Sequence, residues 1–281
     1  MRADLHSHSS ASDGTRAPAD VIARAAAAGL AAIALTDHDT VAGIAEAAAA
    51  LPSGLALIAG MELSCRRDGH SVHLLGYLFD PEHPELAAQT RAIRASRVER
   101  ARAMVAKLAQ LGTGVTWEQV TTIAGDGVIG RPHIARAMIA AGVVGSVDEA
   151  FTPEWIGPGG RAHVRRYALD PANAIALLHA AGGVAVLAHP LAVTRGWIVP
   201  EGLIAELAAA GLDGVEVAHP DHDLAQRTLL SAVARGLDLI ETGGSDDHGQ
   251  LTGDRIGCEA TGADDLDKLL ERASGAPVIR G

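Results

Sequence analysis

Short apolar runs alternate with helical stretches in the first and last parts of the chain. The apolar runs predict buried strands over residues 2–6, 31–36, 55–62, 71–79, 183–188, 214–217 and 237–242. The stretches between them predict helices over residues 18–30, 41–51, 173–181, 203–210 and 224–235, with Thr15 as the candidate N-cap of the first. Such alternation is typical of an α/β fold with a mostly parallel sheet, and seven or so strand–helix units can close into a barrel.

The middle of the chain breaks this rhythm. Its pattern predicts helices over residues 86–111, 117–123 and 133–141. The segment GPGGR at residues 157–161 is rich in Gly and Pro and returns the chain to the alternating pattern. We therefore expect an α/β barrel built from residues 1–83 and 161–281, and a helical insertion of residues 84–160 that serves as a substrate-binding cap.

Composition limits the classes of function. The chain has 281 residues, 48% of them hydrophobic, which is ample for a large core. Aromatic residues make up only 2%, so Ala, Val, Leu and Ile must build that core. The formal net charge of −11 argues against sequence-independent binding to duplex DNA, which needs a basic surface. Bound metal ions would cancel part of this charge, so small anionic substrates stay compatible with it.

The cysteines and the N-terminal segment indicate the compartment. Cys65 and Cys258 stand far apart and outside any metal-binding spacing, which indicates reduced thiols. The first residues, MRADLHSHSS, contain no apolar signal-peptide core, and no apolar run is long enough to cross a bilayer. We expect a cytoplasmic protein without membrane contact, and no obligate protein partner is evident.

Histidines and carboxylates follow most of the predicted strands. They are Asp4, His6, His8, Asp13, Asp37, His38, Asp39, Glu62, His73, His189, Glu216, His219, Asp246, Asp247 and His248. The C-terminal ends of parallel strands emerge on one face of a barrel, and that face carries the active site. His6 and His8 are two residues apart, so along a strand both imidazoles point the same way. The pattern therefore predicts a shared site.

The donor types restrict the metal at that site. His and carboxylate ligands without cysteine suit Mn²⁺, Zn²⁺ or Fe²⁺ better than Ca²⁺ or a structural zinc. More than four or five ligands implies more than one ion, so we expect two to three divalent ions. Clustered ions can clamp a phosphoryl group, lower the pKa of a bound water and stabilise the leaving oxygen.

The motifs resemble those of the PHP (polymerase and histidinol phosphatase) metal-dependent phosphoesterases. They are, in family order, DLHSHSSASDG, TDHD, GMELS, HSVHLLGY, LAHP and GSDDHG. The resemblance implies a distorted (β/α)7 barrel with a trinuclear metal centre. It also implies that His6, His8, Glu62 and Asp246 hold one ion, that Glu62 bridges to a second held by His73 and His189, and that Asp13, His38 and His248 hold a third.

The insertion narrows the resemblance further. Gly-Arg-Pro-His at residues 130–133 and GGRAHV at residues 159–164 resemble stand-alone phosphatases of nucleoside 3′,5′-bisphosphates, whose relatives include 5′→3′ exonucleases on short RNA. Arginine offers a planar fork for phosphate oxygens, and a helix start attracts anions. The predicted substrate-binding residues are Arg131, His133, Arg136, Arg161, His219 and His222, and the nearby Arg165 and Arg166 are interpreted as solvated surface.

These observations predict hydrolysis of a phosphate monoester by attack of a metal-bound hydroxide. The expected reaction converts a nucleoside 3′,5′-bisphosphate to the 5′-monophosphate and phosphate, with His222 or a metal-bound water as proton donor. The alternatives are 5′→3′ exonucleolytic trimming of short RNA, histidinol-phosphate hydrolysis, and a non-catalytic metal-binding regulatory domain. The last would be expected to have lost ligands, whereas every ligand position of the family is filled here.

Overall fold

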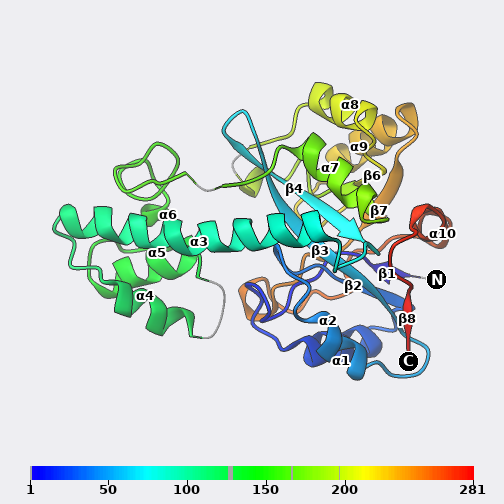
Figure 1. Ribbon diagram of the computed structural model, residues 1–281, viewed down its shortest axis with the longest axis horizontal. Coiled ribbons are helices and arrows are strands. Elements are labelled where there is room, and N and C mark those ends of the chain that lie inside the picture. Colours follow the sequence, from blue (N-terminus) through cyan, green and yellow to red (C-terminus); the bar gives the residue numbers. More distant parts are fainter. Residues whose placement is uncertain (1, 126–128, 166, 196) are drawn as a thin grey trace. The chain divides into compact units, whose positions relative to one another are not determined.

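The computed structural model describes residues 2–125, 129–165, 167–195 and 197–281 (Figure 1). They form two compact units, one running up to Thr90 and again from Ala168 onwards, the other comprising Arg91–Tyr167. The division predicted from the sequence, at residues 84 and 160, falls slightly earlier at each boundary. Within the described ranges no helix combines the length and apolar character that a membrane span requires.

The first unit is built around one sheet whose strands pair in chain order, from β1 to β7. The strands are β1 (Ala3–Asp4), β2 (Ala32–Leu35), β3 (Ala56–Arg67), β4 (His70–Tyr77), β5 (Val184–Leu187), β6 (Gly214–Ala218) and β7 (Ile240–Gly243). β1, β2 and β3 are parallel, and so are β5, β6 and β7. β4 is antiparallel to both of its neighbours, β3 and β5.

The direction of β4 follows from a tight turn. β3 continues past the predicted strand end at Glu62 as far as Arg67, and β4 begins at His70. Asp68 and Gly69 between them both have positive φ, 50° and 86°. Two left-handed residues make the turn that joins antiparallel strands. A hairpin therefore replaces a strand–helix–strand crossover at this point, which is why the sheet is less uniformly parallel than predicted.

Backbone hydrogen bonds close the sheet on itself. Beyond the short strand β1, the Leu5 N–H donates to the Gly243 carbonyl at 3.2 Å, and the Asp246 N–H donates to the His6 carbonyl at 2.8 Å. The His8 N–H continues the series, donating to Asp247 at 3.0 Å. The segments that follow β1 and β7 thus lie side by side, and the predicted distorted barrel is confirmed.

Alternate residues of each strand face inward and outward. Ala32 and Ala34 of β2 belong to the cluster that fills the barrel, whereas Ile33 and Leu35 belong to the cluster that packs against α1 and α2. The helices of this unit are α1 (Pro18–Ala27), α2 (Ile44–Ala49), α7 (Pro171–Ala180), α8 (Glu201–Ala209), α9 (Leu224–Gly236) and α10 (Ala263–Arg272) (Figure 1). Alanine inside the barrel keeps it narrow, which suits a chain so poor in aromatic residues.

Three local features differ from the sequence predictions. Thr15 does not cap α1, because the N-cap is Ala17 and no side chain caps that end. The Thr15 hydroxyl instead accepts the Gln250 N–H at 2.8 Å, joining the loops that follow β1 and β7. Helix α10 and the short strand β8 (Ile279–Arg280), which pairs with β3, were not predicted. Leu266 and Leu269 of α10 contribute to the interior cluster of the barrel.

Tyr77 is the largest of the fully buried side chains in the described chain. Its hydroxyl donates to the Leu5 carbonyl at 2.8 Å, so it links β4 to the segment that carries the first histidines. Tyr77→Phe should lower the free energy of unfolding by about 1 kcal/mol, because a buried carbonyl loses its donor. Urea denaturation of the metal-free protein measures this, with Tyr167→Phe, whose residue is 45% exposed, as the control. Equal midpoints for both variants would contradict the assignment.

The second unit has a helical core of its own. Its helices are most of α3 (Pro84–Gln110), then α4 (Trp117–Ala124), α5 (Arg131–Ala140) and α6 (Val147–Ala150). Met104, Leu108, Val120, Ile134 and Met138 form the centre of its apolar cluster. A capping box, in which Thr116 and Gln119 satisfy each other's backbone N–H groups, starts α4.

Candidate metal centre

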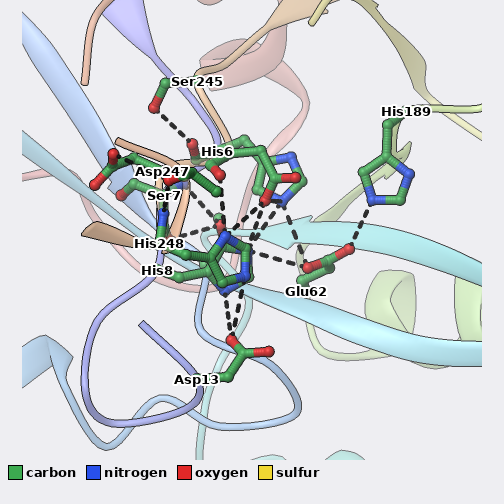
Figure 2. Close-up of polar contacts among 12 residues, drawn as sticks. His6, Ser7, His8, Asp13, Glu62, His189, Ser245, Asp247 and His248 are labelled. Atoms are coloured by element: carbon green, nitrogen blue, oxygen red, sulfur yellow. Dashed lines mark hydrogen bonds and ion pairs between the residues drawn. The ribbon is translucent and has the colours of Figure 1, made fainter. Parts of the chain in front are cut away.

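The predicted metal ligands converge at one end of the barrel (Figure 2). They are His6 and His8 after β1, Asp13 in the following loop, His38 after β2, Glu62 in β3, His73 in β4, His189 after β5, and Asp246 and His248 after β7. Figure 2 shows Glu62 between the His6–His8 pair and His189, with Asp13 beyond His8. The strand-end position predicted from the sequence is therefore what gathers these side chains.

Four donor atoms form a compact group at the centre. The Nε2 atoms of His6 and His8 lie 3.2 Å apart, and each is 3.2 to 3.4 Å from Glu62 Oε2 and Asp246 Oδ1. All four residues are buried. A tetrahedral ion with metal–ligand bonds of about 2.0–2.1 Å needs donors about 3.3–3.4 Å apart. The spacing thus fits a divalent ion without rearrangement.

Glu62 presents its second oxygen to another pair of histidines. Glu62 Oε1 lies 2.6 Å from His73 Nδ1 and 3.0 Å from His189 Nε2. A carboxylate with each oxygen among different imidazoles is placed to bridge two ions. His8 Nδ1, Glu62 Oε2 and His73 Nδ1 are buried and form no hydrogen bond with the described part of the chain. Buried polar atoms of this kind need a partner, and a cation supplies one.

A third group surrounds Asp13. Its Oδ1 lies 3.3 Å from His248 Nε2 and its Oδ2 lies 3.5 Å from His38 Nε2. His8 Nδ1 is 3.7 Å from the same carboxylate. The Asp13 side chain is 40% exposed, whereas those of His8 and Glu62 are inaccessible, so the cluster opens to solvent on the Asp13 side.

The electrostatics of the cluster couple protons to metal. Burial opposes the charge on Glu62, yet His38, His73 and His6 hold the pKa of its carboxyl well below the usual range. Burial also opposes the charge on His8, but hydrogen bonds to Asp246 and Glu62 raise its pKa to about 10. In the metal-free protein a proton therefore occupies a position that an ion would take, and the two compete.

Glu216 is a site residue that the predicted ligand set omits. Its Oε1 lies 3.0 Å from His6 Nδ1, and its Oε2 accepts the His189 N–H at 2.8 Å. A carboxylate behind a ligating imidazole fixes the ring and its tautomer. Burial disfavours the ionised form, but His6 and His219 lower the pKa of Glu216 to about 2. The signal available in the sequence was a lone charge inside the apolar run GVEV, because an unpaired charge there is costly.

Two aspartates of the TDHD motif hold loops rather than the centre itself. Asp37 accepts hydrogen bonds from the Ser9 N–H at 2.8 Å and the Ser12 hydroxyl at 2.6 Å, which ties down the loop that carries Asp13. Asp39, whose φ is 54°, accepts the Ser64 N–H at 2.7 Å. These contacts place the segments on either side of the cluster.

His222 is fully enclosed and engaged on both nitrogens. Its Nε2 accepts the Leu191 N–H at 3.2 Å, so its ring proton is on Nδ1, which donates to the Val217 carbonyl at 3.1 Å. Burial lowers the pKa of this imidazole and keeps it neutral. The structure therefore offers no support for the predicted role of His222 as a proton donor. His219 is likewise buried, with Asp246 on one side and the Asp221 N–H on the other.

The other predicted substrate contacts lie in the unit of residues 91–167. There the Arg131 guanidinium stacks 4.8 Å above the Phe151 ring, and Arg161 pairs with Glu154 at 2.7 Å. His133 Nδ1 accepts the Gly130 N–H at 3.0 Å, at the start of α5. Arg136 is exposed on that helix, and Arg166 lies outside the described residues. Phosphate contacts by Arg131, His133, Arg136 and Arg161 stay predictions.

A barrel with a histidine–carboxylate cluster at its strand ends defines a metal-dependent hydrolase. The PHP domain model matches residues 4–113. The chain is 39% identical to a 5′-3′ exoribonuclease of Haemophilus influenzae, over 87% of this chain and 89% of the relative. It is 37% identical to a 3′,5′-nucleoside bisphosphate phosphatase of Chromobacterium violaceum, over 90% and 89%.

A solved structure agrees with these relatives. A Bifidobacterium adolescentis protein, assigned by inference as a metal-dependent phosphoesterase, is 33% identical to the chain and superposes with a TM-score of 0.85 over 97% of this chain and 96% of its own. The chain therefore belongs to the PHP family. It is a hydrolase of phosphoric ester bonds that binds divalent metal.

Proposed function

We propose that this protein removes the 3′-phosphate of nucleoside 3′,5′-bisphosphates to give the 5′-monophosphate and phosphate. The observation that carries the proposal is Glu62, whose two oxygens lie among separate sets of histidines, so that two to three ions of Mn²⁺, Zn²⁺ or Fe²⁺ can be held side by side. The bisphosphate phosphatase of 37% identity supports the choice of substrate. Ions bound there would supply Lewis acidity and an acidified water.

The residues of the chain have distinct roles in this proposal. Glu216 orients His6 through its ring nitrogen, while Asp37 fixes the loop of Asp13. The substrate enters on the Asp13 side, where the cluster is open. His219 and His222 keep their ring protons in hydrogen bonds inside the fold, so the leaving oxygen takes its proton from solvent water.

The remote phosphate is expected to bind the arginines predicted from the sequence, Arg131, Arg136 and Arg161. Binding energy at a non-reacting group can align the reacting one. A substrate with two phosphates should therefore be turned over faster than one with a single phosphate. We expect adenosine 3′,5′-bisphosphate to exceed AMP in kcat/KM, and equal or higher values for AMP would refute the bisphosphate assignment.

Trimming of short RNA from the 5′ end is the second candidate, favoured by the exoribonuclease of 39% identity. The test runs the Mn²⁺-loaded protein on adenosine 3′,5′-bisphosphate and on a 5′-phosphorylated RNA pentamer. Orthophosphate and AMP from the bisphosphate, with an intact pentamer, establish the phosphatase. Stepwise mononucleotides from the pentamer establish the exonuclease. A Glu62→Gln preparation purified in parallel reveals any contaminating phosphatase.

A further inference from the structure

The two carboxylate oxygens of Asp246 have different neighbours. Oδ1 lies 3.3 Å from His6 Nε2 and 3.2 Å from His8 Nε2, within the central group of donors. Oδ2 lies 3.3 Å from His219 Nε2. The φ of Asp246 is 48°, in the left-handed region, so its backbone conformation depends on the surrounding contacts. What holds Oδ2 therefore decides how Oδ1 faces the centre.

Hydrogen bonds fix the tautomer of His219. The backbone N–H of Asp221 donates to His219 Nδ1 at 3.0 Å, so that nitrogen carries a lone pair and no proton. The ring proton of the neutral imidazole must then be on Nε2, where it is donated to Asp246 Oδ2. His219 is fully buried, which favours this neutral form. The histidine acts here as a donor that orients Asp246.

Arg227 of α9 holds both ends of the turn that contains His219. Its Nη2 donates to the His219 carbonyl at 2.8 Å and its Nε donates to the His222 carbonyl at 2.9 Å. The other edge of the guanidinium makes a two-pronged pair with Glu259, at 2.9 and 2.6 Å. Only the planar fork of arginine offers donors in all these directions at once.

We propose that Arg227 and Glu259 form a clamp that positions Asp246 for metal binding, acting through His219. The guanidinium sets the turn of residues 219–222, the turn aims His219 Nε2–H at Asp246 Oδ2, and that bond turns Oδ1 toward His6 and His8. None of this requires Arg227 to touch the substrate or an ion. The assignment rests on the proposed metal centre, and its kinetic consequence rests on the proposed phosphoesterase.

A direct ligand role for His219 is the main alternative, because donor atoms of His6, Glu216 and His219 also lie close together. Two substitutions at His219 separate the roles. The side-chain amide of His219→Gln can still donate a hydrogen bond toward Asp246 but is a poor metal ligand, whereas His219→Leu can do neither. Positioning predicts that the His219→Gln variant retains most of the Mn²⁺ affinity and that the His219→Leu variant loses it. Equal losses for the two variants would overturn the positioning role.

The clamp itself is tested with Arg227→Met and Glu259→Gln. The matched control is Arg235→Met on the same helix, whose side chain is 70% exposed and lies 3.7 Å from Glu241. Titration calorimetry of the metal-depleted full chain gives the Mn²⁺ dissociation constant, and the visible spectrum of the Co²⁺-loaded protein reports the coordination geometry. We expect Mn²⁺ to bind the clamp variants about 10–100-fold more weakly, with an altered Co²⁺ spectrum, and the control to match the wild type.

A purely structural role would lower the thermal midpoint of the clamp variants without changing their Mn²⁺ affinity or Co²⁺ spectrum at temperatures where they are folded, and that result overturns the proposal. If Arg227→Met does not fold, Glu259→Gln, which keeps the arginine, carries the test. The loss should appear in kcat rather than KM at saturating Mn²⁺. Weakened metal binding in a protein that hydrolyses no nucleotide would leave the clamp standing and refute the proposed function alone.

Discussion

Glu62→Gln is expected to lower kcat for phosphoester hydrolysis by on the order of 10³-fold or more, the largest effect of any single substitution we predict. Glu62 Oε2 lies 3.4 Å from His6 Nε2 and 3.2 Å from His8 Nε2. Its other oxygen lies 2.6 Å from His73 and 3.0 Å from His189. Glutamine has the same shape but turns one oxygen into an NH₂ group that cannot ligate, so the bridge between the two sets of donors is lost.

The measurement pairs turnover with metal content. Wild type, Glu62→Gln and the exposed control Glu85→Gln are loaded with Mn²⁺, desalted and analysed for bound metal and for phosphate release. We expect the Glu62→Gln protein to retain fewer ions per chain and the control to be unchanged. Full turnover with full metal content would show that Glu62 is not the shared ligand. Full metal content without turnover would place its role in the reaction rather than in binding.

The strands of the barrel could be predicted because burial leaves a strong pattern. Residues 31–36 read as an unbroken apolar run, since Ala32 and Ala34 fill the barrel while Ile33 and Leu35 face helices. Both faces are buried, as expected for parallel strands under helices. The direction of β4 could not be predicted in this way. It depends on the two left-handed residues of a tight turn, and a period-two pattern is the same in either direction.

The metal ligands could be predicted because position at a strand end and side-chain type are both written in the sequence. The roles of the remaining polar residues could not, because they depend on which partner reaches which atom. His219 and His222 stand three residues apart in the same turn, yet one orients Asp246 and the other binds only backbone groups. A histidine acquires its tautomer from its neighbours in space, and those neighbours come from other strands.

Removing the metal should destabilise the protein increasingly as pH rises. The folded-state pKa of His8 in the metal-free protein is about 10, above its unfolded value of about 6.5. A raised pKa contributes stability that is fully present below pH 6.5 and is lost as pH rises toward 10. Glu216 behaves in the opposite sense. Its pKa of about 2 contributes stability above pH 4.5 that is lost as pH falls toward 2. The metal-free protein should therefore be most stable between about pH 4.5 and 6.5.

The metal-loaded protein should behave differently, because ligation requires deprotonated imidazole and so strengthens with pH. A ligand at 1,000 times its dissociation constant stabilises by about 4 kcal/mol, and each ion adds its own contribution. We expect the thermal midpoint of the chelator-treated protein to fall by about 5–10 °C between pH 6.5 and 9.5, while that of the Mn²⁺-loaded protein holds. A His8→Asn variant should lose much of this slope. Calorimetric titration with Mn²⁺ at pH 8 in buffers of different ionisation enthalpy should show net proton release. A metal-free midpoint that stays level or rises with pH, or metal binding without proton release, would mean that His8 is already neutral and that protons and metal do not compete at this centre.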